Sequence, residues 1–444
     1  MKEFMMFPPR SEKNKQKKQE KQRRVSRFWM WLNLFLILII VVMGAYFLLM
    51  DRDMQDSSDS EGLPDSSIVA DQQSGDETGE PASEVPDKIA DHEAADTDDE
   101  SGSSSAPDSN EKADDPSENG TQGEEAAPDG AELLIHFAGD TIFSDKVAVK
   151  LKKEGYDYPY EYVRELFQND DLTVLNLETP VTERGVGAEN KTFVFKSSPQ
   201  ALPEMAKAGV DAVNLANNHS LDQGIEGLLD TIDHLNANKI LHTGAGKNST
   251  EAFAPIYVER KGIKIAICGF SRVIPEESWA AGKKRAGVAA TYNSEQAIKA
   301  IQTARQNADL VLVVAHWGKE RVTQLEKHQT TLAHEYIDAG ADLVIGGHPH
   351  VLQGIEKYKN KWIAYSTGNF IFTKSNDPKT WDTAVFSVKC TQKGDCDLTL
   401  TPYRTELGRP VPVSAEDGAA ILKQVESLSQ GIKIDASGHV TTNN

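Results

Sequence analysis

Short apolar runs alternate with helix-like segments throughout residues 131–444, and this alternation limits the folds that the chain can adopt. Runs of five to seven mostly apolar residues are typical of buried β-strands, and they lie at 133–138, 172–177, 212–216, 265–270, 310–316 and 343–347. Apolar residues recur at helical spacing in the segments 160–169, 198–208, 224–236, 294–306 and 324–339. Three further stretches are expected to form β-hairpins around KG, KN and KGD turns, at 256–270, 354–370 and 384–403. Strands that alternate with helices, combined with hairpins, predict an α/β domain with two packed β-sheets and helices outside them.

Residues that bind metals or transfer protons follow the ends of five predicted strands. In chain order these residues are Asp140, Glu178, Asn218, His219, His316, His348 and His350. Loops at the carboxyl ends of the strands gather at one edge of an open α/β sheet, so we expect these side chains to converge. Oxygen and nitrogen donors in this combination would suit one or two divalent metal ions of the Mn, Zn or Fe type.

Each of these residues also has a structural explanation when it is taken alone. Asp140 could cap a helix, and Glu178 could lie in an exposed turn. Asn218 could cap the segment that follows it, and His316 could be a hydrogen-bonded core histidine. Their shared position directly after β-like runs favours a common site over separate explanations.

The residues around these positions form five motifs, which read GDTIFSD, LNLETPVT, LANNHSLDQG, VVAHWGKE and GGHPHVLQGIEKYKNKWIAYSTGNFIF. Their order and length resemble the successive motifs of the CapA family, the capsule and poly-γ-glutamate synthesis group within the calcineurin-like metallophosphoesterase fold. The resemblance extends over about residues 133–372. It implies a metallophosphoesterase-like sandwich of two β-sheets flanked by helices.

The resemblance also implies a role for each matching residue. It makes Asp140 the metal ligand of the first motif, Glu178 the carboxylate that bridges two metals, and His219 the acid that protonates the leaving oxygen. The remaining ligands that it implies are Asn218, His316, His348 and His350. The residues of these motifs that would lie behind the ligands or face the substrate are Asp222, Trp317, Glu320, Ser366 and Asn369.

Two positions depart from the pattern of the wider superfamily. Its first motif is D-x-H, whereas the histidine position is occupied here by Ile142. The bridging carboxylate is glutamate rather than aspartate, which moves its oxygens by the length of a methylene group. One metal position therefore loses a ligand, which leaves open a two-ion site, a one-ion site, weak binding or a pocket without a metal.

A 23-residue run without charged side chains, 28–50, follows a segment that contains ten Lys and Arg residues. As a helix this run would rise about 34 Å, enough to span a hydrocarbon core of ~30 Å. It is too long for the apolar region of a signal peptide and no small-x-small cleavage site follows it, which favours an uncleaved single-pass membrane anchor. The basic segment 1–27 is then expected in the cytoplasm and the chain after residue 50 outside the cell.

Residues 51–130 follow this run and account for the negative net charge of the chain. They contain 26 acidic and three basic side chains and no aromatic residue, so they cannot bury enough apolar surface to offset chain entropy. We expect a disordered acidic linker that holds the domain away from the membrane, with cation binding by its carboxylates as the alternative. Residues 131–444 carry a net charge of only −5, which argues against a nucleic-acid-binding domain.

The chain contains three cysteines, and none has a zinc-finger or redox spacing. Cys268 lies in an apolar run and is expected to be a small buried residue. Cys390 and Cys396 flank a hairpin turn, which is compatible with either a disulfide or two free thiols.

Three functional hypotheses follow from the motifs and the expected topology. The first is a membrane-anchored extracellular component of capsule or poly-γ-glutamate synthesis or export, with polymer synthase or export subunits as partners and an anionic polymer as ligand. The second is a metal-dependent hydrolase, such as a phosphoesterase, that acts at the cell surface. The third is a non-catalytic scaffold that binds the polymer.

Overall fold

A computed structural model of the 444-residue chain describes residues 130–189 and 191–443. The predicted basic segment 1–27, the predicted anchor 28–50 and residues 51–129 of the predicted linker lie outside the described residues. Within the part of the chain that is described, no helix is both long and apolar enough to cross a lipid bilayer.

The larger of the two main sheets has eight strands and includes the first strand of the domain. In spatial order its strands are β16 (Pro410–Pro412), β15 (Cys396–Thr405), β14 (Asp382–Thr391), β1 (Glu132–Thr141), β2 (Leu172–Leu177), β3 (Ala212–Asn214) and β4 (Leu241–Thr243), and β13 (Asn369–Ile371) also pairs with β1. Strands β1 to β4 run parallel to one another, whereas β14 and β15 form a long antiparallel hairpin beside β1.

The second sheet has six strands and is mostly parallel. Its spatial order is β11 (Ile355–Tyr358), β12 (Lys361–Ala364), β10 (Leu343–Gly347), β9 (Leu310–His316), β7 (Ile263–Ser271) and β6 (Ile256–Arg260). The two edge strands, β11 and β6, are antiparallel to their neighbours. Two short ribbons pair β5 (Ala245–Gly246) with β8 (Gly287–Val288) and β17 (Ile432–Ile434) with β18 (Val440–Thr442).

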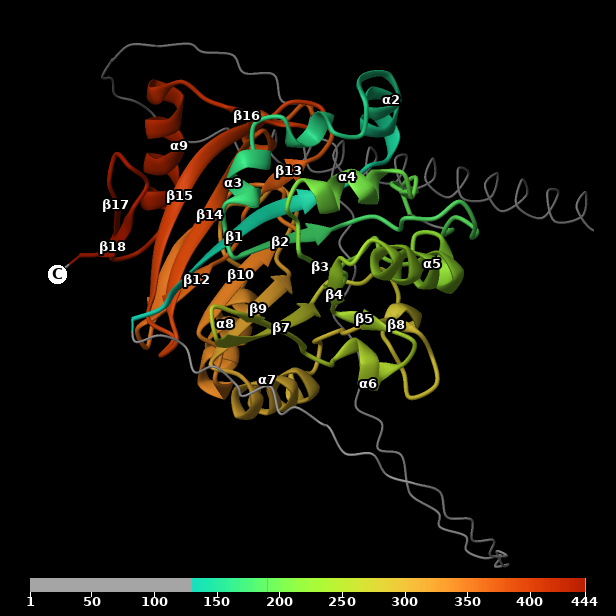
Figure 1. The fold of residues 1–444 in the computed structure, drawn as a ribbon, viewed down its shortest axis with the longest axis horizontal. Helices are drawn as coiled ribbons and strands as arrows, with labels where there is room; N and C mark the ends of the chain where they lie inside the picture. The colour runs from blue at the N-terminus through green and yellow to red at the C-terminus, as the bar shows by residue number, and fades with distance from the viewer. Residues whose placement is uncertain (1–129, 190, 444) are drawn as a thin grey trace, which may run out of the picture. The chain divides into compact units, whose positions relative to one another are not determined.

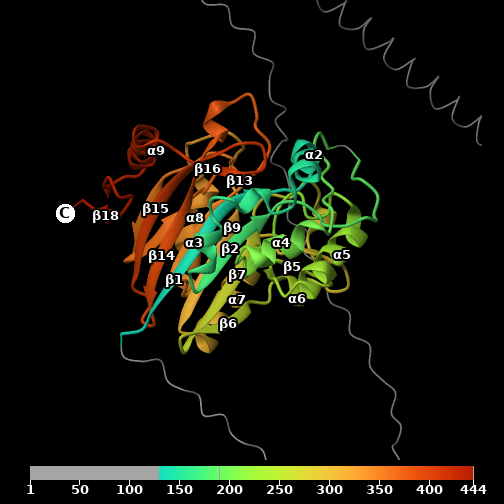
Figure 2. The same cartoon turned by 45° about the horizontal axis from the view of Figure 1, so that its top comes forward.

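Helices lie outside the sheets (Figures 1 and 2). The α-helices of the described residues are α2 (Asp145–Glu154), α3 (Arg164–Gln168), α4 (Ala201–Lys207), α5 (Gly224–Ala237), α6 (Ser249–Ala252), α7 (Glu295–Asn307), α8 (Lys327–Ala339) and α9 (Ala415–Ser427). The short 3-10 helices are η1 (Tyr158–Tyr160), η2 (Glu277–Trp279) and η3 (Pro378–Thr380).

Three apolar cores explain why the strands read as continuous apolar runs. One core lies between the sheets and contains Phe137 of β1 and Leu312 of β9. A second joins the other face of the larger sheet to its helices and contains Leu175. A third joins the second sheet to α7 and α8 and contains Val313. Successive residues of one strand therefore enter different cores, which requires apolar side chains on both faces, and the predicted arrangement of two packed sheets with helices outside is confirmed.

Four predicted elements are shorter than expected, and the predicted helices 198–208 and 324–339 begin only at Ala201 and Lys327. The predicted strand 212–216 ends at Asn214, because the side-chain oxygen of Asn214 accepts a hydrogen bond from the backbone nitrogen of Ala216 at 3.0 Å and turns the chain. The predicted helix 160–169 is α-helical only over Arg164–Gln168, and the 3-10 helix η1 with Pro159 near its start precedes it.

The three predicted hairpins are confirmed as β6–β7, β11–β12 and β14–β15. Lys359 and Asn360 form the turn between β11 and β12 with φ values of 46° and 66°, the left-handed conformation that a two-residue hairpin turn favours. Cys390 and Cys396 lie opposite each other on β14 and β15 and form a disulfide, while Cys268 is a buried free thiol.

Replacing both cysteines of this disulfide with serine is expected to lower the free energy of unfolding by about 2 kcal/mol, because the bond closes a short loop in the unfolded chain. Urea unfolding of the double variant, compared with the oxidised and reduced parent protein, measures this change. A parent protein whose stability does not respond to reductant would contradict the expectation.

Candidate metal centre

The parallel strands of both sheets end on the same side of the domain, where the predicted residues follow them (Figure 1). The pairing of Asp140 with Asn176 aligns β1 with β2, and the pairing of His316 with Gly347 aligns β9 with β10. The seven residues predicted from strand ends are all buried, with exposed fractions of 9% or less: Asp140, Glu178, Asn218, His219, His316, His348 and His350.

Two groups of possible metal ligands share Glu178. Glu178, His316 and His348 form one group, and Asp140, Glu178 and His350 form the other, with the ligand atoms of each group within 4.8 Å of one another. Oε1 of Glu178 lies 3.5 Å from Nε2 of His316 and 3.9 Å from Nε2 of His350. The carboxylate that was predicted to bridge two metals therefore lies between the two groups.

Three donor atoms of this centre lack a hydrogen-bond partner among the described residues. Both carboxylate oxygens of Glu178 and Nδ1 of His348 are buried without a hydrogen-bond partner among residues 130–189 and 191–443. A buried polar group without a partner costs free energy, and a buried carboxylate costs more. Such a group of carboxylate and imidazole donors fits a divalent cation of the Mn, Zn or Fe type.

Asn218 also belongs to this donor set. Its Oδ1 lies 2.8 Å from Nε2 of His316, which is close to the separation of about 3 Å between neighbouring ligands that each bind an ion at ~2.1 Å. Nδ1 of the His316 ring lies 3.2 Å from Nδ2 of Asn176. Asn176 was not predicted, although an amide inside the apolar run LTVLNL is a signal that could have revealed it.

Asp140 is held in place from three sides. Its Oδ1 accepts a hydrogen bond from Asn176 at 2.7 Å, and its Oδ2 accepts one from the backbone nitrogen of His348 at 3.2 Å. Nδ1 of His350 lies 3.1 Å from the same Oδ2. Burial by itself would raise the pKa of Asp140, but the hydrogen bond and charge of His350 outweigh it and hold the pKa of Asp140 below its ordinary value.

The histidines respond to the same charges. Burial would lower the pKa of His350, yet the carboxylates of Glu178 and Asp140 raise it to about 10. Burial, together with the neighbouring His316 and His350, lowers the pKa of His348 well below its ordinary value. The carboxylates of Asp140 and Glu178 therefore attract positive charge, while His348 stays a neutral imidazole that can bind a metal ion.

The backbone of the last motif brings the two imidazoles to the centre. His348 and His350 have φ values of 93° and 57°, a left-handed conformation that costs a non-glycine residue about 1–3 kcal/mol. A Cβ atom on Gly347 would lie 2.8 Å from Oδ1 of Asp140, so only glycine lets the strand approach this carboxylate. Ile142, at the position of the missing histidine, packs in the core beneath the helices.

His219 lies beside the donor set and is oriented by its neighbours. Its Nδ1 is 2.6 Å from Oδ2 of Asp222, and its ring stacks on Phe195 at a centroid distance of 4.3 Å. Because a carboxylate only accepts hydrogen bonds, Nδ1 of His219 donates to Asp222. Nε2 is then the ring nitrogen that remains for a contact with a ligand.

Lys191 connects these residues and was missed by the sequence analysis. Its Nζ donates to Oδ1 of Asp222 at 2.5 Å and to the backbone oxygen of Asn218 at 2.6 Å. Burial lowers the pKa of Lys191, and the charge of Asp222 opposes part of that shift. No pattern around Lys191 marks it, because it lies in the long loop between β2 and α4.

The other predicted residues occupy different surroundings. Oδ1 of Asn369 accepts a hydrogen bond from Nδ1 of His350 at 2.9 Å, and Glu320 lies near His348 and His350. Trp317 is buried in the third core and donates to the backbone oxygen of Tyr365, and the hydroxyl of Ser366 accepts from the backbone nitrogen of Gly368. The structure thus brings Asp222, Glu320 and Asn369 to the centre and places Trp317 and Ser366 in the framework behind it.

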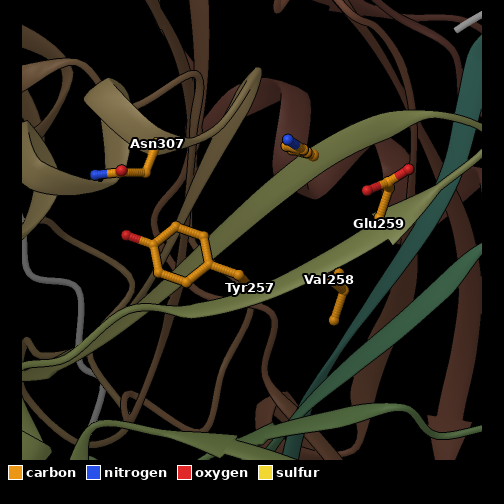
Figure 3. Close-up of a pocket in the computed structure, with 5 residues that line it drawn as sticks. Tyr257, Val258, Glu259 and Asn307 are labelled. Atoms are coloured by element: carbon orange, nitrogen blue, oxygen red, sulfur yellow. The ribbon is translucent and has the colours of Figure 1, made fainter. Parts of the chain in front are cut away.

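A cleft of about 380 Å³ opens onto this centre. His219, His350, Asn369 and Glu320 line it together with three phenylalanines, Phe193, Phe195 and Phe372, and three basic side chains, Lys146, Arg321 and Lys374. A second hollow of about 570 Å³ lies along β6, where it is lined by Tyr257, Val258, Glu259, Lys264 and Asn307 (Figure 3). None of the predicted site residues lies in that second hollow, so the chemistry of the first cleft is the relevant one.

The family model "Bacterial capsule synthesis protein PGA_cap" matches residues 134–374. The capsule biosynthesis protein CapA of Bacillus anthracis is 30% identical over 66% of this chain and 72% of its own length. The PGA biosynthesis protein CapA of Bacillus subtilis is 31% identical over 64% of this chain and 74% of its own length. Among solved structures, a hypothetical protein from Thermus thermophilus aligns with a TM-score of 0.40 and 16% identity over 63% of this chain and 100% of its own, a likeness too low to bear on the site.

Proposed function

Because this chain belongs to the bacterial capsule synthesis family PGA_cap, we propose that it is an accessory protein in the synthesis or export of a capsular polymer, with poly-γ-glutamate as the polymer. Its relatives from two Bacillus species carry names that refer to capsule and PGA biosynthesis. The basic side chains around the cleft support an anionic ligand, because Lys146, Arg321 and Lys374 would attract carboxylates. Polymer synthase or export subunits are the partners that this role requires.

The location that we propose is the outer side of the cell membrane, with the segment 28–50 as a single-pass anchor. The apolar length of that segment and the basic residues before it support this topology. The disulfide between Cys390 and Cys396 also supports it, because disulfides persist in oxidising compartments outside the cytoplasm.

The observation that carries a metal-dependent role is the buried carboxylate of Glu178, which lies between two groups of ligands and accepts no hydrogen bond from the described residues. Glu178, Asn218, His316 and His348 would hold one divalent ion, and Asp140 and His350 would share Glu178 for a second. A bound cation would act as a Lewis acid on a phosphoryl or carbonyl oxygen of the ligand.

The position of His219 favours hydrolysis as a second candidate function. His219 lines the cleft, and its hydrogen bond to Asp222 orients the ring so that Nε2 can give a proton to a leaving oxygen or nitrogen. Asp222 would stabilise the charged ring, and Lys191 would hold Asp222 in place. A phosphoester or an amide-like bond of the polymer is the substrate class that suits these residues.

Deletion of the gene in its native host, followed by measurement of γ-glutamyl polymer on the cell surface, tests the proposed role. We expect the polymer to be lost and to return when the parent gene is supplied. Complementation with His219→Asn separates the candidates, because a hydrolase requires this residue and a polymer-binding scaffold does not. Unchanged surface polymer in the deletion strain would contradict the role in capsule synthesis.

A further inference from the structure

We propose that Glu320 is an additional metal ligand that closes the centre from the side of the cleft, an inference that rests on the proposed metal-dependent function. Its carboxylate forms a third group with His348 and His350, in which the ligand atoms lie within 4.8 Å of one another. Glu320 is exposed, whereas both histidines are buried. It therefore approaches the two histidines from the solvent side.

Two backbone hydrogen bonds fix the loop of Glu320 against the loop of the two histidines. The nitrogen of Trp317 donates to the oxygen of Gly347 at 3.1 Å, and the nitrogen of Arg321 donates to the oxygen of Pro349 at 2.7 Å. Arg321 has a φ value of 61°, a left-handed conformation that the loop must maintain at this point. Glu320 lies between these two attachments, so its position next to His348 and His350 is a built feature of the fold.

The ligand count explains what Glu320 would contribute through His350, the residue that its group shares with the group of Asp140 and Glu178. The group around His316 has Asn218 as a fourth donor, whereas the group of Asp140, Glu178 and His350 has three side chains. Ions of the Zn, Mn or Fe type take at least four ligands. The histidine that would supply the fourth is replaced by Ile142, which is buried in the core and offers no donor atom.

The donors around Glu320 remain available to a cation. Nδ1 of His348 is buried without a hydrogen-bond partner among the described residues, which by itself points to a missing ligand. No hydrogen bond or ion pair within residues 130–189 and 191–443 engages the carboxylate of Glu320. The carboxylate of Glu320 could therefore bind the ion as a further ligand and also move away to release the ion.

Titration of the full chain, stripped of metal, with Mn²⁺ in a calorimeter tests this inference, with Glu320→Gln as the variant. We expect the substitution to weaken Mn²⁺ binding by at least about 10-fold, since loss of even an outer partner of a metal ligand weakens affinity 10–100-fold. The matched control is Asp145→Asn, because Asp145 lines the same cleft and belongs to none of the ligand groups. Its affinity should stay within about twofold of the parent chain, since it offers no ligand.

A spectroscopic readout separates ligation from a loss of overall negative charge. The visible absorption of the Co²⁺-loaded chain is expected to change in Glu320→Gln and to stay unchanged in Asp145→Asn. Equal Mn²⁺ affinity and equal spectra for Glu320→Gln and the parent chain would overturn the assignment of Glu320 alone. A parent chain that binds no Mn²⁺ would overturn the metal centre as well, so the two failures are distinguishable.

Discussion

The variant Glu178→Gln is expected to lose tight binding of divalent cations altogether. Glu178 belongs to both groups of ligands, so one substitution removes a negative ligand from each of them while it preserves the shape of the side chain. Because loss of an outer partner already weakens metal affinity 10–100-fold, we expect a shared ligand to cost at least about 100-fold. Metal content after dialysis and calorimetric titration measure the change.

The thermal stability of this variant provides a second test, in which the expected change is a gain and not a loss. In the absence of metal, Glu178→Gln is expected to unfold at a higher temperature than the parent chain, because it removes a buried carboxylate that accepts no hydrogen bond from the described residues, while Asp140 still pairs with His350. Saturating Mn²⁺ should raise the unfolding temperature of the parent chain and leave that of the variant unchanged. Glu165→Gln, an exposed glutamate on α3, is the control for charge removal. A variant that binds Mn²⁺ as tightly as the parent chain would show that Glu178 is not a ligand.

The variant His219→Asn is expected to lower kcat for hydrolysis of a phosphodiester by about 10²–10⁴-fold, the usual contribution of a general acid. Its effect should depend on the leaving group. A nitrophenolate is stable enough to leave without a proton, whereas an alkoxide must be protonated as it leaves. We therefore expect a large loss with an alkyl phosphodiester and a much smaller loss with a nitrophenyl phosphodiester. Steady-state kinetics on both substrates measure this difference.

Metal binding separates the role of His219 from a structural one. His219 lies beside the ligand groups but belongs to none of them, so His219→Asn should bind Mn²⁺ as the parent chain does. His234→Asn, on α5 and outside the cleft, is the matched control for loss of an imidazole. Equal losses with both phosphodiesters would contradict the assignment of His219 as the proton donor.

The convergence of these side chains could be predicted because strand ends are a topological property. Once a run is recognised as a parallel strand, the residue after it must lie at the carboxyl edge of the sheet, and this placed Asp140, Glu178 and His316 correctly. The hairpins followed from turn residues in the same way. Residues 1–129, which include the predicted membrane anchor, lie outside the described structure, so the anchor stays a prediction.

Contacts between distant loops could not be predicted from local patterns. Lys191 reaches Asp222 from a loop without regular structure, and the approach of Glu320 depends on hydrogen bonds between the loops after β9 and β10. Trp317 and Ser366 fall in the motifs, yet they support the framework. Position in a motif does not distinguish a side chain that faces the cleft from one that packs behind it.

Anomalous diffraction from crystals of this protein grown with Mn²⁺ is the most direct test of a cation centre built around Glu178. A peak bonded to a carboxylate oxygen of Glu178, with imidazole nitrogens of the neighbouring histidines at about 2.0–2.3 Å, is the result that we predict. A map without a peak between these side chains, at Mn²⁺ concentrations that saturate other such sites, would contradict the centre and the hydrolytic function derived from it.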